Sequence, residues 1–576
     1  GGGDPLPLSY GEFDVTAARW SPDGKRLAYI SNASGTTEIW IQDLVSGRKQ
    51  RLQQARREHV WPAGQLEVQV VDTAGATVPA RLSVGGSDGR SYGPDDAWLH
   101  ADDGFDRALQ KFETHYFHAS GPSTVTLPEG EAEVTVWRGL EHAIERRKVR
   151  IEAGRTQSLT IESRPLALPP GWSQNWASGD VHVHMNYGGS YRNTPARMVA
   201  QAAAEDLDLV FNLVVNKEQR IPDIGYFSTE PDAASNAQVV LLHGQEFHTG
   251  YWGHLGLLGL RQHFLLPDYS AYPNTGMASP FPDNATVADL ARGQGALVGY
   301  VHPYDAAPDP DNDARLTNAL PIDVALGKID YYEVSGFSHY AETQQVWYRL
   351  LNCGFRLAAA GGTDAMANYA SLRGPVGLNR VYVMADPSAD KGPSDAAGHR
   401  DRWLQGLKAG RTMATNGPLL GFEAEGLGPG ATLQLPPGIH EVTVRGFLRS
   451  MVPVDHLEIV FNGEVLRSVT IDPTGTAADV SGTVELNRSG WLLLRARSDQ
   501  AHPDVFDRWP YATTNPVFVQ VGSRPVRSSE DAAYFLRWIE RVREFTEASE
   551  DYNTAEEKRA VLKNIEAARV EFEKRR

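Results

Sequence analysis

Two histidines, His182 and His184, stand two positions apart in an apolar stretch and have the clearest capacity for chemistry in this chain. Residues 179–189 read GDVHVHMNYGG. Side chains at positions i and i+2 of a β-strand share one face, so both imidazoles can bind one metal ion without a bend in the backbone. Asp180 shares that face and could support a ligand through a hydrogen bond. The alternative is a chance pair in a solvated loop, because His-x-His is a short pattern.

Three further residues of metal-binding types stand where other predicted strands end. Glu246, His302 and Asp364 each follow a strand that is predicted in the central region. The carboxyl ends of parallel strands meet at one edge of an α/β fold. We therefore expect these three residues to converge with His182 and His184 on a single pocket, and we interpret that pocket as a metal site.

The elements expected to carry these residues begin near residue 171, where strands start to alternate with helices. Asn193, Thr194 and Pro195 have the composition of a helix N-cap followed by proline in the first turn. Helices are predicted over 196–206, near 286–293 and over 339–352. The strand that contains His182 is followed by predicted strands over 207–215, 239–242, 254–260, 296–301, 329–334 and 356–360. Repeated strand–helix units predict a mainly parallel sheet or a barrel. The long connection 261–285 is rich in aromatic residues and proline, which is typical of a lid.

The regions around this segment show β alternation. Residues 11–52 predict short strands with turns at Ser21-Pro22-Asp23-Gly24 and Ser34-Gly35. Residues 62–168 predict a β-sandwich, and we favour a spacer role over a binding role because no cluster of convergent polar residues is visible. A second sandwich is predicted to about residue 523, with a hairpin turn at Asn462-Gly463.

The end of the chain is predicted to be helical, with two apolar stripes. The stripes consist of Phe535, Trp538, Val542 and Phe545, and of Val561, Ile565, Ala568 and Phe572. Thr554 with Glu557 forms a capping box between them. A helical hairpin docked on the body is the favoured interpretation, because each stripe is too short to argue for a coiled coil. Assembly into a homo-oligomer is an alternative that the sequence leaves open.

Composition restricts the classes of function. The 576 residues allow about three to five domains, and the formal net charge of −17 argues against nucleic acid or an anionic membrane as a partner. No apolar run reaches the length of a membrane span, so membrane insertion is not expected. Cys353 is the only cysteine, so a metal would depend on His, Asp and Glu. The start, GGGDPLPL, shows no signal peptide, although a mature chain would look the same.

A short N-terminal stretch resembles a known repeat. Residues 20–29, WSPDGKRLAY, are followed by TEIW at 37–40, and together they resemble one repeat of the Tol-type β-propellers over about forty residues. No second copy is visible, so either further blades lie elsewhere or this sheet packs as an isolated module. The resemblance favours a bacterial periplasmic or secreted location.

Five motifs of the central region occur in a characteristic order. They are GDVHVH at 179–184, GQE at 244–246, GHLGLLGL at 253–260, VHPY at 301–304 and GGTDA at 361–365. Together they resemble the PHP superfamily of metallohydrolases, named for polymerase and histidinol phosphatase, and within it the carbaryl-hydrolase-type, or CehA/McbA, group. The resemblance spans 172–416 and continues into ATNGP at 414–418. It implies that His182, His184 and Asp364 hold one metal, that His254 and His302 hold a second, and that Glu246 bridges the two.

Two positions depart from the pattern of the superfamily. Members with three metals carry a histidine where this chain has Asn216, and another where it has Met366. Both histidines would serve the third metal, so their loss implies one or two divalent metal ions. Zinc or manganese is most expected, and iron is also compatible with mixed imidazole and carboxylate ligands. The loss also disfavours phosphatase activity, because a third cation helps to neutralise a phosphate.

Aromatic residues crowd the neighbourhood of the predicted ligands. Core packing explains most aromatic side chains, but several here adjoin a predicted ligand and could form an apolar substrate wall. They are Tyr187, Tyr191, Phe247, Tyr251, Trp252 and Tyr304. His243 is expected in a core or supporting role, and His263 and His339 are taken as ordinary histidines.

These features predict a metal-dependent hydrolase that cleaves an ester, carbamate or amide bond of a small organic substrate through metal-bound hydroxide. His248 and Asp364 are the candidates for moving a proton to the leaving group, with a packed or surface role as the alternative for His248. A phosphoesterase with the same metals is the second hypothesis, and the basic residues near the ligands are Arg192, Lys217, Arg220 and Arg373. A non-catalytic metal-containing binding protein is the third.

The expected architecture is therefore a multidomain chain of α/β and all-β parts. We expect a PHP-type distorted (β/α) barrel flanked by β-sandwich domains, with a C-terminal helical hairpin. The expected divisions are a propeller-blade-like segment at 1–58, a sandwich at 59–170, the barrel at 171–418, a second sandwich at 419–525 and the helical tail at 526–576.

Overall fold

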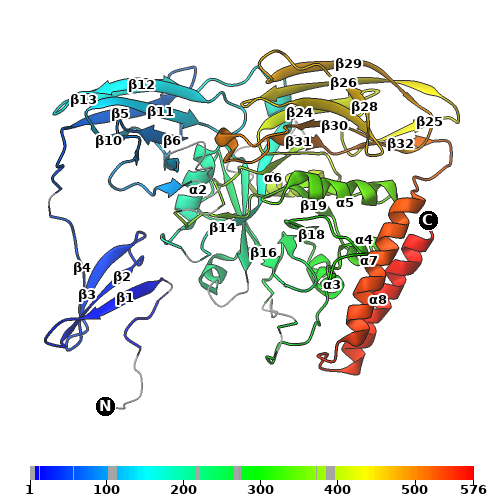
Figure 1. The fold of residues 1–576 in the computed structure, drawn as a ribbon, viewed down its shortest axis with the longest axis horizontal. Helices are drawn as coiled ribbons and strands as arrows, with labels where there is room; N and C mark the ends of the chain where they lie inside the picture. Colours follow the sequence, from blue (N-terminus) through cyan, green and yellow to red (C-terminus); the bar gives the residue numbers. More distant parts are fainter. Residues whose placement is uncertain are drawn as a thin grey trace.

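The chain folds into several β layers around an α/β region, with two long helices at one side (Figure 1). The computed structural model describes residues 7–11, 13–55, 57–101, 113–187, 189–215, 221–264, 271–272, 274–370, 373–384 and 396–576. This arrangement agrees with the expected combination of α/β and all-β parts.

The N-terminal residues form a four-stranded antiparallel sheet in the order β1-β2-β3-β4. Its strands are β1 (Val15–Trp20), β2 (Arg26–Ser31), β3 (Glu38–Asp43) and β4 (Lys49–Arg51). The turn between β1 and β2 is closed by backbone hydrogen bonds from Ser21 to Arg26 and from Gly24 to Ser21, and Gly24 has the positive φ of 68° that such a turn favours. The sheet has the strand number of a propeller blade.

Two sheets that share one core follow. The first is ordered β10-β5-β13 and the second β12-β11-β6-β9-β8, with β7 paired to β6. Their strands are β5 (Ala63–Val71), β6 (Ala80–Gly85), β7 (Ser91–Tyr92), β8 (His100–Ala101), β9 (His115–Ala119), β10 (Ser123–Pro128), β11 (Gly130–Trp137), β12 (Glu145–Ile151) and β13 (Thr156–Glu162). Alternate residues of β5, namely Leu66, Val68 and Val70, are buried in the shared core. The layer is a sandwich of two sheets, as the alternation predicted.

The central region carries the strands that hold the predicted site. The strands are β14 (Trp176–His184), β15 (Leu209–Val215), β16 (Val240–Phe247), β17 (Leu255–Leu258), β18 (Leu297–Tyr300), β19 (Tyr331–Ser335), β20 (Ala358–Gly361), β21 (Ala365–Met366), β22 (Arg380–Met384) and β23 (Thr412–Thr415). Parallel pairing joins β14 to β15, β15 to β16, β18 to β19 and β19 to β20, whereas β17 is antiparallel to both of its neighbours. Only seven residues separate β16 from β17, and a connection that short cannot make a parallel crossover.

Helices connect these strands. They are α1 (Trp172–Asn175), α2 (Pro195–Ala204), η1 (Ile221–Tyr226), α3 (Asn284–Gly293), α4 (Leu320–Ala325), α5 (Tyr340–Asn352) and α6 (Ala396–Lys408). The predicted start of α2 is confirmed, because the Thr194 side chain accepts a hydrogen bond from the Arg197 amide and Pro195 is the first helical residue. The predicted lid 261–285 lies partly outside the described residues, and its described end contacts α8 through Ser279 and Glu557.

The central sheet continues beyond residue 418 into the C-terminal β region. Strand β23 pairs with β31 (Tyr511–Thr514), and the ladder goes on through β30 (Gly490–Arg497), β27 (His456–Phe461) and β28 (Glu464–Ser468). A second sheet, β24 (Pro418–Ala424), β26 (His440–Ser450) and β29 (Ala477–Leu486), faces it across a common core. The remaining elements are β25 (Thr432–Leu435), β32 (Val517–Val521) and η3 (Pro503–Val505). The two regions are therefore joined by one continuous backbone ladder.

The C-terminal helices α7 (Ser529–Ala548) and α8 (Ala555–Glu573) form a hairpin that packs on the α/β region (Figure 1). The predicted capping position Thr554 accepts a hydrogen bond from the Glu557 amide. Both predicted stripes are buried except for Phe545, which is half-buried. Within the described residues, no helix is long and apolar enough to span a membrane.

Candidate metal centre

Six side chains that the sequence singled out come together at one end of the central strands. His182 and His184 close β14, Glu246 lies near the end of β16, and His254, His302 and Asp364 lie directly before β17, after β18 and after β20. His182, His184, Glu246 and Asp364 are almost fully buried, and His254 and His302 are partly exposed. The structure thus brings together all six residues proposed as ligands.

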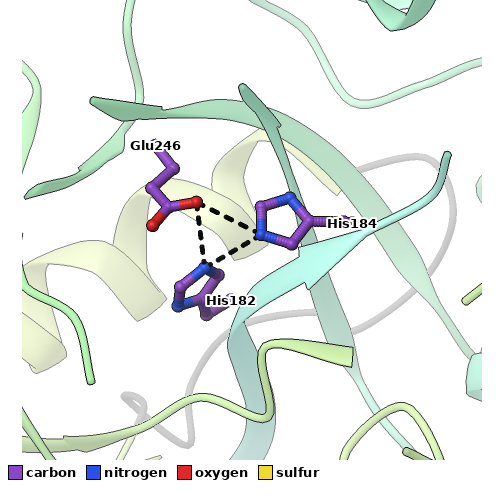
Figure 2. A group of neighbouring side chains, drawn as sticks. All are labelled: His182, His184 and Glu246. Carbon is purple, nitrogen blue, oxygen red and sulfur yellow. Dashed lines mark hydrogen bonds and ion pairs between the residues drawn. The ribbon is translucent and has the colours of Figure 1, made fainter. Parts of the chain in front are cut away.

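The inner part of the group consists of His182, His184, Glu246 and Asp364. Figure 2 shows three of them pointing toward one another, with 3.2 Å between the two imidazole Nε2 atoms. Glu246 Oε2 lies 3.6 Å from His182 Nε2 and 3.2 Å from His184 Nε2. Asp364 Oδ1 lies 3.4 Å from His182 Nε2 and 3.0 Å from His184 Nε2. Donor atoms around a tetrahedral zinc ion, with bonds of about 2.1 Å, are roughly 3.4 Å apart. The distances from the two imidazole nitrogens to each other and to both carboxylate oxygens are therefore close to those between ligand atoms on one metal ion.

The outer part of the group shares Glu246 with the inner part. Glu246 Oε1 lies 2.9 Å from His254 Nδ1 and 3.2 Å from His302 Nε2. The two imidazole nitrogens are 3.3 Å apart. Glu246 thus directs one carboxylate oxygen to each pair of histidines. Three protein ligands with an open position are the usual arrangement of a catalytic metal site.

Arg373 is a further neighbour of Asp364. Asp364 Oδ2 is 3.9 Å from His302 Nε2 and forms a close ion pair with Arg373 Nη1. The Arg373 guanidinium also lies over the Phe337 ring, 3.7 Å from its centroid, and that ring is 5.0 Å from the His302 ring. Arg373 and Phe337 therefore line one side of the centre.

The imidazole nitrogens that face away from the group have partners as well. His184 Nδ1 donates to the Leu213 carbonyl at 2.8 Å, which leaves the Nε2 lone pair of a neutral ring for a metal. His182 Nδ1 lies 3.3 Å from Glu333 Oε1. The other oxygen of Glu333 accepts the backbone N–H of His302 at 2.7 Å. Glu333 was not predicted to belong to the site. The sequence indicates it only by a carboxylate within the buried strand YYEVS.

Asp180 supports the centre through the backbone rather than through an imidazole. Its carboxylate accepts hydrogen bonds from the amides of His182 (3.1 Å), Thr363 (3.0 Å) and Gly377 (2.7 Å) and from the Thr363 hydroxyl (2.6 Å). The same carboxylate therefore joins β14 to the loop that presents Asp364. Burial raises the pKa of Asp180 to about 6, against the effect of these hydrogen bonds.

The charges of the inner group are strongly coupled. Burial lowers the pKa of His182, but the carboxylates of Asp364 and Glu333 outweigh burial and hold this pKa well above its ordinary value. Burial also lowers the pKa of His184, and Asp364 with Glu246 raises it above the ordinary value. The Glu246 pKa moves the opposite way, because His182 and His184 outweigh its burial and hold it well below the usual range.

Two of the six residues have unusual backbone conformations. His302 has a φ of 27° and Asp364 a φ of 54°, both in the left-handed region that residues other than glycine rarely adopt. Strained conformations of this kind persist where the surroundings hold them, and they cluster at functional sites. Close packing contributes here, since a Cβ at Gly362 would lie 2.6 Å from the His182 Cβ and 2.5 Å from Glu333 Oε1.

The donor set suits a divalent metal. Four imidazoles and two carboxylates are compatible with zinc, manganese or iron, and three overlapping trios of these residues have donor atoms within 4.8 Å of one another. Cys353, the only thiol, is buried in the core that α7 and α8 share with the central region. A buried cluster of histidines and carboxylates that could hold a metal ion is therefore present, as the spacing predicted.

The other predicted residues occupy varied places. The His248 ring packs against the His254 ring with 3.7 Å between centroids, so His248 adjoins the outer trio. His243 pairs with Asp232 at 2.9 Å, in a supporting position away from the six. Met366 is buried in β21, whereas Asn216, Lys217 and Arg220 lie outside the described residues. Arg192 lies 3.7 Å from Asp223.

The six aromatic residues that the sequence singled out also lie in different surroundings. The Tyr187 ring lies 5.2 Å from the His184 ring. Phe247, Trp252 and Tyr304 are buried in the core, Tyr251 packs against that core, and Tyr191 stacks on Trp98. The Tyr187 ring therefore lies beside a proposed ligand.

Sequence comparison finds one short likeness. No protein-family model matches the chain. The Tol-Pal system protein TolB of Coxiella burnetii (strain RSA 493 / Nine Mile phase I) is 41% identical over 54 residues, which amount to 9% of this chain and 12% of that protein. The chain therefore matches only a small part of the length of this relative. The likeness supports a Tol-type repeat region in the chain.

Comparison with solved structures finds partial likenesses. GBS52, the minor pilin of Streptococcus agalactiae, is 16% identical, covers 26% of this chain and 63% of its own, and has a TM-score of 0.15. The Bacillus anthracis TIE protein is 10% identical, covers 29% of each chain and has a TM-score of 0.13. These scores are too low to identify a common fold.

Proposed function

We propose that this protein is a metal-dependent hydrolase that cleaves an ester, carbamate or amide bond of a small organic substrate. The observation that carries it is that the Nε2 atoms of His182 and His184 lie 3.0–3.6 Å from carboxylate oxygens of both Glu246 and Asp364, next to a second trio that shares Glu246. The proposal includes the PHP superfamily and its CehA/McbA group, a distorted barrel at 171–418 and the domain divisions given above. The motifs quoted from the sequence support it.

The residues of the chain have separate roles in this proposal. A bound divalent metal would lower the pKa of a water molecule to about 7 and would polarise the bond under attack. His182, His184 and Asp364 would hold one ion and His254 with His302 a second, with Glu246 between them. Glu333 and the Leu213 carbonyl orient two of the imidazoles.

Proton transfer would fall to His248 and Asp364. His248 adjoins the outer trio, where a substrate would reach the open position, and can deliver a proton to the leaving atom. Burial raises the pKa of Asp364, but His182, His184 and His302 outweigh burial and hold this pKa below the usual range, so the carboxylate is ionised and would be available to a proton from water.

A phosphoesterase is the second candidate, and Arg373 is the observation that favours it. Its guanidinium contacts Asp364 Oδ2 and stays partly exposed, with 29% of the side chain accessible. Arginine donates paired hydrogen bonds to phosphate oxygens. An anionic group of a substrate could therefore approach the metals beside Arg373. A bacterial periplasmic or secreted location is also part of the proposal, supported by the Tol-type repeat.

A matched panel of substrates tests the proposal. The purified protein, loaded with zinc or with manganese, is assayed on an aryl ester, an aryl carbamate, an aryl amide and an aryl phosphate with the same leaving group. We expect metal-dependent turnover of a carboxylic substrate, and faster turnover of the phosphate alone would favour the second candidate. Tight metal binding without turnover of any of the four would contradict both, and would leave a non-catalytic binding protein.

A further inference from the structure

The two loops that leave the proposed metal ligands are tied to each other. The loop after His184 runs from β14 to α2, and the loop after Asp364 runs from β21 to β22. Asn368, which is buried, accepts the Tyr187 amide at 3.0 Å with its side-chain oxygen and donates its side-chain N–H to the Tyr191 carbonyl at 3.0 Å. Its own carbonyl accepts the Tyr191 amide at 3.0 Å. Any shift of one loop would therefore break bonds to the other.

The first loop is also held by the N-terminal sheet. In the turn between β2 and β3, Thr37 Oγ1 donates to the Ser190 carbonyl at 2.5 Å and Asn32 Nδ2 donates to the Gly189 carbonyl at 3.2 Å. In the opposite direction, the Arg192 amide donates to the Gly35 carbonyl at 3.0 Å. The Tol-type repeat region thus reaches the site through one turn and three hydrogen bonds.

Both loops also contact the β-sandwich that follows the N-terminal sheet in the chain. The Tyr191 hydroxyl donates to the Leu99 carbonyl at 2.8 Å and accepts the Leu99 amide at 3.0 Å, while its ring stacks on Trp98 at 4.5 Å between centroids. His100 Nδ1 donates to the Tyr369 carbonyl at 2.7 Å. The β8 segment, which comprises Trp98, Leu99 and strand β8, therefore contacts both of the loops that Asn368 joins.

We propose that the β2–β3 turn and the β8 segment act as a brace that fixes these two loops, and that the brace holds the Tyr187 ring beside His184 as a wall of the substrate site. This inference rests on the proposed hydrolase function. It gives the single blade-like sheet a task within the site, although that sheet does not close into a propeller with the described residues. Thr37, Tyr191 and Asn368 are then positioning residues.

Two substitutions that conserve shape test the brace. Thr37→Val removes the bond to Ser190, and Tyr191→Phe removes both bonds to Leu99, and neither changes the packed volume much. In the double variant we expect KM to rise about tenfold, with kcat within about twofold and metal content unchanged. We also expect the Arg192 amide and its neighbours at 189–193 to exchange hydrogen about tenfold faster, while strand β27 exchanges as before.

The controls separate bracing from general damage. Thr37→Ser keeps the donating hydroxyl and is expected to behave as the wild type. Ser46→Ala removes a side-chain bond within the β3–β4 turn, to Asp43, and is expected to leave both KM and loop exchange unchanged. Unchanged exchange at 189–193, unchanged KM, or a fall in kcat and metal content in place of a KM change would each overturn the brace. A wild-type protein without turnover would overturn the proposed function instead, and the exchange measurement would still decide whether the brace exists.

Discussion

Glu333 lies directly behind His182, with 3.3 Å between its Oε1 and the imidazole Nδ1. Its second oxygen accepts the backbone N–H of His302 at 2.7 Å. One buried carboxylate therefore supports a residue of the inner group and a residue of the outer trio. Carboxylates in this position make a ligating imidazole more basic and fix its orientation.

Replacing Glu333 should weaken metal binding without destroying the site. Glu333→Gln keeps the size of the side chain and removes the charge that helps to raise the pKa of His182. We expect metal affinity to fall about 10- to 100-fold, measured by competition with a chelator. Glu342→Gln, in the first turn of α5, is the matched control and should leave the affinity unchanged. Equal affinities for the wild type and Glu333→Gln would show that Glu333 has no supporting role.

Loss of a proposed ligand should abolish turnover while the fold persists. His184→Ala and Glu246→Ala each remove a donor atom from the inner group, and Glu246→Ala also removes the carboxylate proposed to lie between the two ions. We expect kcat to fall by at least about a thousandfold, with an unchanged circular dichroism spectrum. His440→Ala, at a half-buried position in β26 whose ring contacts the Pro436 carbonyl, serves as the control. Wild-type rates in either ligand variant would refute the site.

Metal affinity should increase with pH. In the metal-free protein, the pKa values of His182 and His184 lie above their ordinary value. The protonated imidazoles therefore stabilise the metal-free fold fully below about pH 6.5. This contribution is lost as the pH rises through the pKa values of the folded state. A metal must displace their protons, so apparent affinity should rise by up to about tenfold per pH unit for each proton released.

Two measurements check this dependence. Zinc competition titrations at pH 6, 7 and 8 should show the rise in affinity, and turnover should fall below about pH 6. Stability of the metal-free protein should decline from pH 6 toward pH 9, followed by thermal unfolding. A flat activity profile down to pH 5 would contradict imidazole ligation.

The helical hairpin should contribute strongly to stability. Trp538 is fully buried, its Nε1 donates to the Asn318 carbonyl at 2.9 Å, and its ring lies 5.7 Å from that of Tyr304, two residues beyond His302. Trp538→Ala should lower the free energy of unfolding by about 3–5 kcal/mol, measured by denaturant titration. Val570→Ala, at an exposed position on α8, should change it by less than about 0.5 kcal/mol. Similar effects of the two changes would show that the hairpin does not depend on this packing.

Much of the proposed site was predictable because its residues follow a local rule. His182 and His184 share a face through the period of two in a strand. Glu246 lies near the end of its strand, and His302 and Asp364 follow theirs, at the same edge. A local pattern and a general property of α/β folds are sufficient for that prediction. His254 came only from the resemblance to a family.

What escaped prediction depends on contacts between distant parts of the chain. Glu333 is one acidic residue in an apolar strand, and nothing local shows that it lies behind His182. The continuous ladder from β23 to β31 joins residues about a hundred positions apart, so local alternation could not reveal it. The bond from Thr37 to Ser190 joins residues that are even more distant, 153 positions apart in sequence.

Metal stoichiometry is the measurement that tests the central claim most directly. The full chain is purified, equilibrated with zinc or manganese, freed of loosely bound ions and measured by inductively coupled plasma mass spectrometry, beside His182→Ala and His184→Ala. We predict one or two tightly held equivalents in the wild type and a loss of at least one equivalent in each variant. Less than one equivalent in the wild type, with no gain after zinc or manganese is added, would contradict the proposed metal centre and the hydrolase together.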